Sequence, residues 1–453
     1  MLPAKAKDPQ KQHQISQAIE IIAVELACLG QGREMRQRAR KSAVEARLAY
    51  SIRKIIRDAL GATSLDKNGE ASIAKSPGWY KLGQYNWHLT YRVHVKLAYE
   101  GLINLGYLQE TKKGVSDKGV GLYRTKYVAT EKLRALVGPF RASELDRLMP
   151  LENNQDLIRV QKVTKVFLAG RTKPARPTER LEYKDNDLTH VMRSNLRSIN
   201  ALLSQTDLDL HMTAEQVYTL QVTSKFSKAA DRTPTALSRK AIHRVFSSTD
   251  FDEGGRFYGA WWQNIGSWLR PAITINGEPT VECDFASLHP TMLYLERGLQ
   301  ILDDPYAGIL ETEQGQPPID DPFRVSARAF AKVAFNAMVN AKAELGRPPQ
   351  GLRPRDFGLT WRELSQRILE KHNAIADAFY TGQGLRLQHI DSQLAERVML
   401  YFTSKDVPVL PVHDSFIIAA QHQQELVTVM NRVFGERFGG ADIRVTVHRT
   451  SIR

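Results

Sequence analysis

A short segment in the second half of the chain, Val281 to Tyr294, combines strand, turn and helix signals around a single aspartate. Val281 and Cys283 alternate with polar neighbours, and small and polar residues then interrupt the apolar pattern. Such a pattern predicts a short strand that passes through a turn into a helix. Asp284 is therefore expected at the end of the strand, where a carboxylate can hold a metal ion.

A second segment of the same character covers residues 407–419 and places His413 and Asp414 between two apolar half-strands. An ionised aspartate in so apolar a hairpin is unfavourable unless it is paired or bound to a cation. The two segments therefore predict that Asp284 and Asp414, although far apart in the sequence, converge on one divalent-metal site.

The composition is that of a globular protein with more than one domain. The 453 residues are enough for two or three cores, and 42% hydrophobic and 25% charged residues are ordinary values. No run approaches about eighteen consecutive apolar residues and the N-terminus lacks an apolar signal core, so we expect a cytoplasmic protein without a membrane partner. The only cysteines, Cys28 and Cys283, support neither a disulfide framework nor a zinc site.

Positive charge is concentrated in the first half of the chain. Residues 1–250 hold 42 Lys and Arg against 25 Asp and Glu, which gives +17, whereas residues 251–453 hold 21 against 24, which gives −3. A basic surface joined to a carboxylate-bearing region suits a polyanion held near a cation-dependent centre. A basic surface that is merely solvated explains the charge equally well.

The first 150 residues combine helical patterns with a pair of strands. Residues 13–62 carry apolar positions at helical spacing, with a densely basic stretch in the middle. An aromatic and basic helix is predicted over 85–96, followed by a strand over 107–112 and a return strand over 122–130. A Gly-rich basic loop separates the strands, so the pattern is a helix followed by a hairpin with a basic tip.

This helix and hairpin resemble the winged-helix variant of helix-turn-helix domains, in which a helix lies in the major groove and the wing touches the backbone. The resemblance implies DNA contact by basic side chains, and we favour this function over docking to another protein. The side chains concerned are Arg92, Lys96, Lys112, Lys113 and Lys118.

Four short motifs follow one another in the C-terminal part of the chain. They are Asp252-Glu-Gly-Gly-Arg256, Asp284-Phe-Ala-Ser-Leu-His-Pro290, Arg328-Ala-Phe-Ala-Lys332 and Val412-His-Asp-Ser-Phe416. Each is weak alone, because tight Gly-Gly turns and Arg-x-x-x-Lys spacings are common. In this order they resemble the palm and fingers of family A DNA polymerases and single-subunit, phage-type RNA polymerases. The form of the second motif is similar to that of family B DNA polymerases.

The resemblance implies an α+β fold of the right-hand polymerase type, with an antiparallel palm sheet and helical fingers and thumb. The expected organisation is a helical and winged-helix-like domain over 1–150, a Pro-rich linker over 151–180, a thumb-like helical region over 181–245, and the palm and fingers core over 246–453. Within the third region, helices are predicted from Leu181 to Leu210 and from Ala214 to Phe226. The part after the linker is too short for an additional proofreading nuclease domain.

By the same resemblance Asp284 and Asp414 bind two Mg²⁺ or Mn²⁺ ions, which in nucleotidyl transfer lie about 4 Å apart beside the attacking and leaving oxygens. Arg328 and Lys332 lie four residues apart on a helical pattern, so one face can hold a nucleotide triphosphate. Lys332 is also expected to protonate or neutralise the departing pyrophosphate. Asn336 matches the family B pattern and is expected at the nucleotide.

Three further residues are expected to contact the DNA template-primer. Arg256 follows two glycines, which let the backbone approach a phosphate closely. The resemblance places His413 near the primer end and Gln388 beside the primer-template. These roles are implied by the family pattern alone.

His289 stands five residues after Asp284, where DNA polymerases place a bulky side chain against the ribose 2′-hydroxyl. An imidazole is large enough to exclude that hydroxyl, which favours deoxynucleotides. Three positions depart from the family A pattern: Asn340-Ala341 replaces a Tyr-Gly pair, and Ser415 replaces a Glu and matches phage-type RNA polymerases.

The sequence thus favours a compact template-directed DNA polymerase that uses nucleoside triphosphates, such as the replicase of a mobile element. An RNA polymerase or primase is the nearest alternative. A DNA-binding initiator or regulator without catalysis and a two-metal nuclease also remain open.

Overall fold

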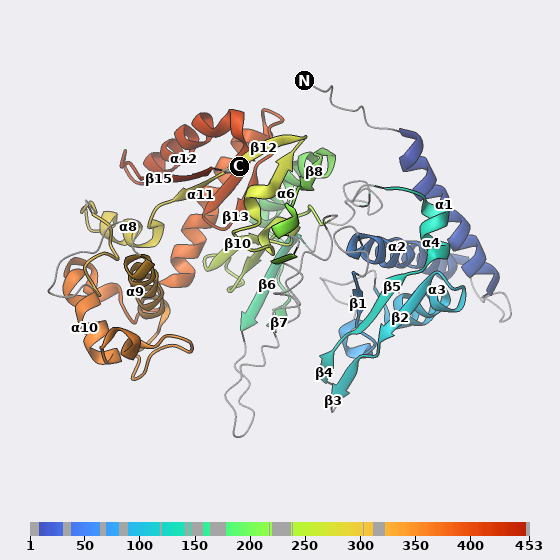
Figure 1. The fold of residues 1–453 in the computed structure, drawn as a ribbon, viewed down its shortest axis with the longest axis horizontal. Helices are drawn as coiled ribbons and strands as arrows, with labels where there is room; N and C mark the ends of the chain where they lie inside the picture. Colours follow the sequence, from blue (N-terminus) through green and yellow to red (C-terminus); the bar gives the residue numbers. More distant parts are fainter. Residues whose placement is uncertain are drawn as a thin grey trace.

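Two hydrophobic cores organise the chain in this computed structural model. The structure describes residues 9–29, 38–63, 69–80, 89–117, 120–140, 145, 157–163, 178–216, 218–219, 237, 239–301, 303–310 and 322–449. The first core takes its buried residues from Ile15 to Leu145 and defines what we call the N-terminal module. The second core runs from Ile158 to Ile443 and defines the C-terminal module. In Figure 1 the N-terminal module lies on one side of the C-terminal strands, and helices α9 and α10 lie on the other.

The N-terminal module packs helices against a small antiparallel sheet. Its elements are α1 (Pro9–Leu29), α2 (Arg38–Ala62), β1 (Ala71–Ile73), η1 (Pro77–Tyr80), η2 (Tyr91–Tyr99), α3 (Glu100–Asn104), β2 (Leu108–Lys112), β3 (Val115–Asp117), β4 (Val120–Tyr123), β5 (Thr125–Ala129) and α4 (Glu131–Val137). The sheet has the order β1-β5-β2, and β3 and β4 form a separate hairpin at its end. The predicted succession of helix, strand, tip and return strand is confirmed, except that Arg124 divides the return strand into β4 and β5.

Helix η2 of this module begins at a local hydrogen bond. The side chain of Thr90 accepts from the backbone N–H of Val93 at 3.2 Å, which satisfies a donor that the first helical turn leaves free. The predicted helical residues 85–88 and the predicted contact Lys118 lie outside the described residues.

The C-terminal module contains two sheets and most of the long helices. Its strands are β6 (Ile158–Val163), β7 (Thr178–Leu181), β8 (Leu208–Leu210), β9 (His243–Phe246), β10 (Gly254–Tyr258), β11 (Ile273–Ile275), β12 (Glu278–Phe285), β13 (Leu410–Val412), β14 (Ser415–Ala419) and β15 (Val445–Arg449). Its α-helices are α6 (Asp187–Gln205), α8 (Leu288–Leu295), α9 (Pro322–Asn340), α10 (Trp361–Lys371), α11 (Gly384–Thr403) and α12 (Gln423–Arg437). Short turns are η6 (Trp261–Gln263), η7 (Arg270–Ala272), η8 (Pro354–Phe357), η9 (Asn373–Ala378) and η10 (Ala420–His422).

The larger sheet is antiparallel and is built around β12. Its order is β13-β14-β12-β11-β8. Strand β15 also pairs with β12, on the edge opposite β14. The second sheet, β10-β9-β6-β7, is antiparallel except where β6 runs parallel to β9. The predicted strand, turn and helix around residue 284 and the predicted hairpin around residue 414 are both confirmed, as β12 with α8 and as β13 with β14.

Two expected features of the region between the modules differ from the structure. Within the expected linker 151–180, Ile158 and Val160 of β6 are fully buried in the second core, because β6 pairs with β7 and β9. The Pro-rich stretch 172–177 lies outside the described residues. Residues 208–210 form an edge strand instead of the end of a helix, because Leu208 and Leu210 are buried alternately.

The expected thumb-like region, 181–245, contributes directly to the second core. Helix α6 begins at a capping box formed by Asn186 and Thr189 and buries Met192 and Leu196 in that core. Of the helix predicted over 214–226, the described positions 214–216 and 218–219 are helical. Among the described helices, none combines the length and the apolar character needed to span a membrane.

Candidate active site

Strand β12 presents two carboxylates on one face because its side chains alternate. Val281, Cys283 and Phe285 are buried, whereas Glu282 and Asp284 on the opposite face are half-buried. The apolar face packs into the second core. The period of two that buries one set of side chains therefore directs both carboxylates to the other side of the sheet.

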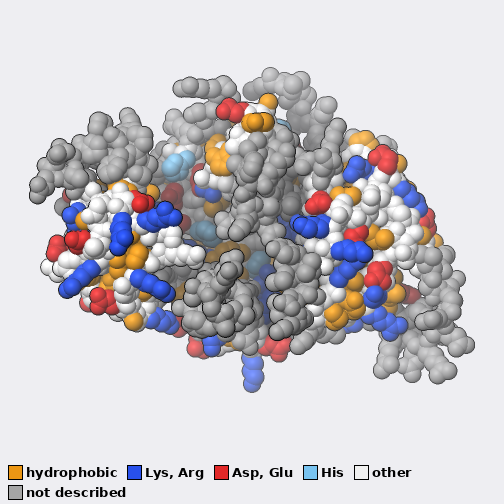
Figure 2. All heavy atoms as spheres, turned by 60° about the horizontal axis from the view of Figure 1, so that its bottom comes forward, with side chains coloured by type: hydrophobic (Ala, Val, Ile, Leu, Met, Phe, Trp, Pro, Cys, Tyr) orange, Lys and Arg blue, Asp and Glu red, His pale blue; other side chains and the backbone are white. Residues whose placement is uncertain are grey.

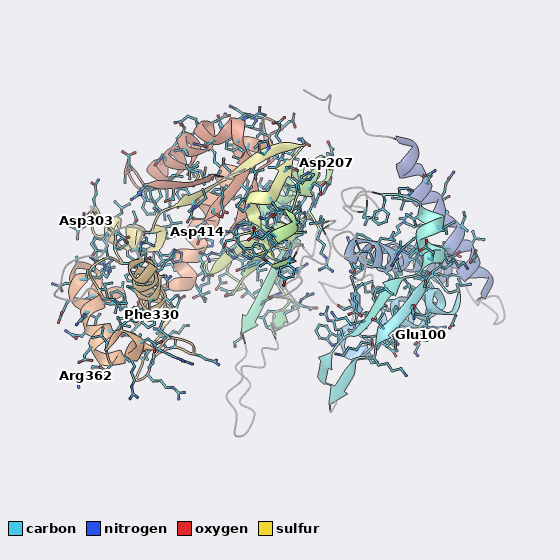
Figure 3. All side chains as sticks on the ribbon, in the orientation of Figure 1. Glu100, Asp207, Asp303, Phe330, Arg362 and Asp414 are labelled. Atoms are coloured by element: carbon cyan, nitrogen blue, oxygen red, sulfur yellow. The ribbon has the colours of Figure 1, made fainter. Side chains whose placement is uncertain are left out.

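The turn between β13 and β14 brings the second aspartate to the same edge. Asp284 lies directly opposite Ser415 across the antiparallel pair, and the N–H of Phe285 donates to the carbonyl of Asp414 at 3.4 Å. The turn residue His413 has a φ of 60°, in the left-handed region that few non-glycine residues adopt. Figure 3 shows Asp414 between the strands and the side of the molecule that carries α9. The predicted convergence of Asp284 and Asp414 is thus present in the fold.

The local charges keep Asp284 difficult to ionise. Burial and the neighbouring Asp414 raise the pKa of Asp284 to about 7, while Lys332 acts in the opposite direction. A divalent cation beside both carboxylates would remove their repulsion, so the pair fits the predicted metal. No group of three or more His, Cys, Asp or Glu side chains gathers into a metal site in the part of the chain that the structure describes. Such an ion would need further ligands from water or a bound ligand, which Mg²⁺ commonly uses.

Helix α9 places one of its two predicted cations toward the carboxylates. Lys332 is exposed and close enough to Asp284 to influence its ionisation. Arg328, one turn earlier, forms an ion pair with Asp304, and its guanidinium lies 5.3 Å from the centre of the Tyr306 ring. Asn336 is half-buried one turn after Lys332. The three positions follow one face of α9, as the spacing predicts.

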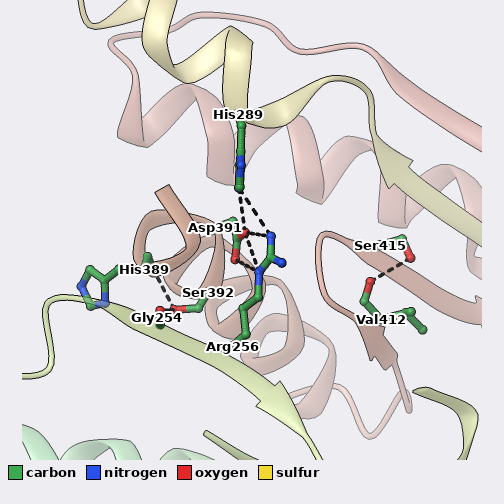
Figure 4. Close-up of polar contacts among 8 residues, drawn as sticks. All are labelled: Gly254, Arg256, His289, His389, Asp391, Ser392, Val412 and Ser415. Carbon is green, nitrogen blue, oxygen red and sulfur yellow. Dashed lines mark hydrogen bonds and ion pairs between the residues drawn. The ribbon is translucent and has the colours of Figure 1, made fainter. Parts of the chain in front are cut away.

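Arg256 and His289 meet at a buried carboxylate. Asp391 of α11 accepts from Nε of Arg256 at 2.9 Å and also forms an ion pair with Nη2 of that side chain. Nε2 of His289 lies 3.3 Å from the same carboxyl oxygen. Figure 4 shows the three side chains converging from β10, α8 and α11. The guanidinium expected at a nucleic-acid phosphate is therefore paired within the protein, and its predicted DNA contact stays a prediction.

The other two predicted template-primer residues lie around this group. The rings of His413 and Tyr258 have centres 5.4 Å apart. Burial, together with Arg256, lowers the pKa of His413, which favours the neutral imidazole. Within the described chain its buried Nδ1 has no hydrogen-bond partner. Gln388 is half-buried on α11, one turn before Asp391.

The basic residues predicted for DNA contact are on the surface of the N-terminal module. Arg92 and Lys96 are exposed on η2, and Lys112 and Lys113 are exposed where β2 leads into the tip hairpin. Nζ of Lys96 lies 2.7 Å from a carboxyl oxygen of Glu100. Figure 2 shows cationic and acidic side chains interspersed on the visible face of this module. The positive charge is thus partly balanced locally.

Two acidic residues of the site were not predicted from the sequence. Asp391 falls on the buried stripe of α11, and an acidic residue in an apolar stripe is a signal for a buried cation. Glu282 stands two residues before Asp284, on the same face of β12. Its carboxylate accepts from Oγ of Ser415 at 2.6 Å and from Nε of Arg270 at 2.8 Å. Alternation along the strand could have identified Glu282, but its partners come from the fold.

Comparison with known proteins gives little further information. No protein-family model matches the sequence, and no curated protein is significantly similar to it. Among solved structures, the chain is similar to the POL domain of Pol1 from M. smegmatis, in a complex with DNA primer-template and dNTP, at 12% identity and a TM-score of 0.34. The match covers 51% of this chain and 51% of that one, so the chain spans about half the length of that protein. A similarity this weak supports no inference about this chain.

Proposed function

We propose that this protein is a template-directed nucleotidyltransferase in which Asp284 and Asp414 hold the divalent ions. The observation that carries the proposal is the position of the two carboxylates at one edge of the sheet, where Asp284 pairs with Ser415, the residue directly after Asp414 in the β13–β14 turn. Half-buried carboxylates that lie close together are characteristic of sites that bind a divalent cation together with the substrate. The four motifs in polymerase order give the reaction class.

In the proposed reaction the 3′-oxygen of a primer forms a bond to the α-phosphorus of a nucleoside triphosphate, and pyrophosphate leaves. Two Mg²⁺ or Mn²⁺ ions, when bound, supply Lewis-acid stabilisation of the attacking and leaving oxygens. Asp284 and Asp414 orient these ions from the sheet. Lys332 and Arg328 of α9 bind the triphosphate, and Lys332 delivers a proton or a positive charge to the leaving pyrophosphate.

We favour deoxynucleotides over ribonucleotides as the substrate. His289 lies in the first turn of α8, five residues after the proposed metal ligand Asp284. Its ring nitrogen Nε2 lies 3.3 Å from the carboxylate of Asp391, which holds the ring in place. A bulky ring held at that place would clash with a 2′-hydroxyl. Asn336 would contact the nucleotide from α9, and Gln388, His413 and Arg256 would lie toward the primer-template.

We also propose that the N-terminal module binds the DNA. Its helix and hairpin carry Arg92, Lys96, Lys112 and Lys113 on the surface, which suits phosphate contacts in the manner of a winged helix. Such a module would hold the template near the catalytic carboxylates.

Primer extension tests the proposal. The purified protein, a primed DNA template and dNTPs should give extension in Mg²⁺ or Mn²⁺ and none after chelation. Asp284→Asn and Asp414→Asn should each lower the rate by about 10³-fold or more, since metal-ion stabilisation is worth several kcal/mol. Glu278→Gln is the matched control, because Glu278 is an exposed carboxylate on the same strand, and its rate should stay within about twofold.

The same assay separates the other functions. Equal or better extension with rNTPs would identify an RNA polymerase or primase, and shortening of the primer would identify a nuclease. Tight DNA binding without extension by the wild-type protein would contradict the proposal and favour a DNA-binding regulator. Full activity in Asp414→Asn would remove the carboxylate pair from the mechanism.

A further inference from the structure

The most completely buried carboxylate of the candidate site is that of Asp391, in the middle of α11. The side chain is 0% exposed, and its ion-pair partner Arg256 is 17% exposed. A carboxylate buried this deeply is stable only when cations or N–H donors surround it. Asp391 therefore depends on its partners, and its partners depend on it for their orientation.

Two guanidinium N–H donors and one ring nitrogen of His289 converge on one oxygen of this carboxylate. Oδ2 of Asp391 receives Nε of Arg256 at 2.9 Å and Nη2 of the same side chain, and it lies 3.3 Å from Nε2 of His289. Nη2 of Arg256 also lies 3.4 Å from Nε2 of His289. A guanidinium can only donate and a carboxylate can only accept, so Asp391 fixes the plane of Arg256 and gives the imidazole a fixed neighbour on one side.

Arg256 and His289, the two partners of Asp391, each lie near one of the proposed catalytic carboxylates. Arg256 lies close enough to Asp414 for that carboxylate to favour its charged form. His289 follows Asp284 through a turn in which Ser287 has a φ of 52°, in the left-handed region. The ring of His289 is therefore positioned by its own chain from one side and by Asp391 from the other, as Figure 4 shows.

A purely structural ion pair on the same helix provides a contrast. Glu396 lies five residues after Asp391 on α11, and its Oε2 lies 2.7 Å from Nη1 of the buried Arg244. Arg244 belongs to β9, and its guanidinium also donates to the carbonyl of Gly255 and to the hydroxyl of Ser392. Both pairs connect α11 to the neighbouring sheet. Of the two carboxylates, Asp391 is the one that also contacts His289, the residue proposed to face the nucleotide sugar.

We propose that Asp391 is a positioning residue that sets the sugar selectivity of the enzyme by fixing His289 and Arg256 in one arrangement. This inference rests on the proposed nucleotidyltransferase function. With the carboxylate in place, the imidazole is a rigid wall beside the sugar. Without it, the ring turns away from Arg256 and leaves room for a 2′-hydroxyl. Loss of the Asp391 carboxylate should therefore favour incorporation of ribonucleoside triphosphates.

Steady-state extension with dNTPs and rNTPs tests this role. Asp391→Asn keeps the size of the side chain and removes its charge, and the ratio of kcat/KM for dNTP over rNTP should fall by about tenfold, mostly through a lower KM for rNTP. The matched control, Glu396→Gln, breaks a second Arg–carboxylate pair on α11, in which the arginine is buried, and should leave the ratio unchanged. Asp391→Glu serves as a second variant if Asp391→Asn does not fold, and it should also lower the ratio because its carboxylate is displaced.

A double variant separates positioning from a general loss of structure. If Asp391 acts through His289, then Asp391→Asn should change the ratio in the wild-type background and add nothing in His289→Ala. An unchanged ratio in both Asp391 variants, an equal effect of Glu396→Gln, or additive effects with His289→Ala would each overturn the inference while leaving the polymerase function intact. A wild-type protein that extends with neither nucleotide class would overturn the proposed function and this inference together.

Discussion

Asp58 in the N-terminal module and Asp284 in the C-terminal module are both withdrawn from solvent but have opposite electrostatic surroundings. Burial opposes ionisation at Asp58, yet the cations around it, Lys54 first, hold its pKa well below the usual range. Nζ of Lys54 lies 2.9 Å from Oδ2 of Asp58, and Nη2 of Arg57 lies 3.1 Å from Oδ1. At Asp284 burial acts in the same direction as the neighbouring Asp414, and the pKa rises to about 7.

The contrast separates a carboxylate that has its counter-charges in the protein from one that we propose to hold a metal ion. The chain supplies the counter-charges of Asp58 from its own helix and from Arg239, so this carboxylate is complete without a ligand. At Asp284 the fold brings a second carboxylate instead, and such an arrangement persists at functional sites although it lowers stability. We expect effects of decreasing size at Asp58, at Asp284 and on the basic surface of the N-terminal module.

The largest effect on stability is expected at Asp58. Asp58→Asn should lower the free energy of unfolding by about 2–4 kcal/mol, because the half-buried Lys54 then loses this counter-charge. Urea denaturation measures the change. The exposed pair Lys96–Glu100 provides the control, since Glu100→Gln should cost no more than about 0.5 kcal/mol. Equal losses in the two variants would mean that burial does not distinguish these ion pairs.

A smaller effect of opposite sign is expected at Asp284. Its raised pKa means that the folded state holds a proton which the unfolded state has already released between about pH 4 and pH 7. The stability of the metal-free protein should therefore fall as pH rises through this window. At pH 8, Asp284→Asn should be more stable than the wild type by about 1–2 kcal/mol after allowance for solvent screening. Near pH 4 the two should coincide.

Thermal melts at both pH values, with and without Mg²⁺, provide the measurement. A cation that binds only the folded wild type should reduce the gap at pH 8. A gap that is the same at pH 4 and pH 8 would show that Asp284 is not the titrating group.

The smallest individual effects are expected on the basic surface of the N-terminal module. Replacing Lys112 and Lys113 by Ala should lower the slope of log affinity against log salt by about 2, since each lost phosphate contact removes about 0.9. Fluorescence anisotropy with a labelled duplex gives the slope. Lys75→Ala is the control, because Nζ of Lys75 already lies 2.5 Å from Glu110. A slope that is unchanged in the double variant would place the DNA grip elsewhere.

Local pattern was sufficient to predict the parts of the site that lie within one segment. Alternation around Asp284 and the apolar flanks of Asp414 predicted β12 and the β13–β14 hairpin, because a half-buried strand has a period of two. The pairing of these strands is long-range, and only the shared chemistry of the two aspartates suggested it.

Features that depend on distant partners could not be predicted. Arg256 was expected to be available for a phosphate, but its counter-ion Asp391 lies 135 residues later in the chain. Strand β6 falls within the predicted linker because Ile158 and Val160 are a weak local signal, and its neighbours β7 and β9 supply its hydrogen bonds. Propensity over six residues is too weak to identify a strand whose partners are unknown.

The most direct test of the account is to measure the binding of Mn²⁺ to the folded protein by electron paramagnetic resonance. The measurement is made at pH 8 in the presence of a non-hydrolysable dNTP. The wild-type protein should bind Mn²⁺, and Asp284→Asn and Asp414→Asn should each weaken binding by about tenfold or more while Glu278→Gln leaves it unchanged. Unaltered Mn²⁺ affinity in both aspartate variants would contradict the claim that these two carboxylates form one metal site.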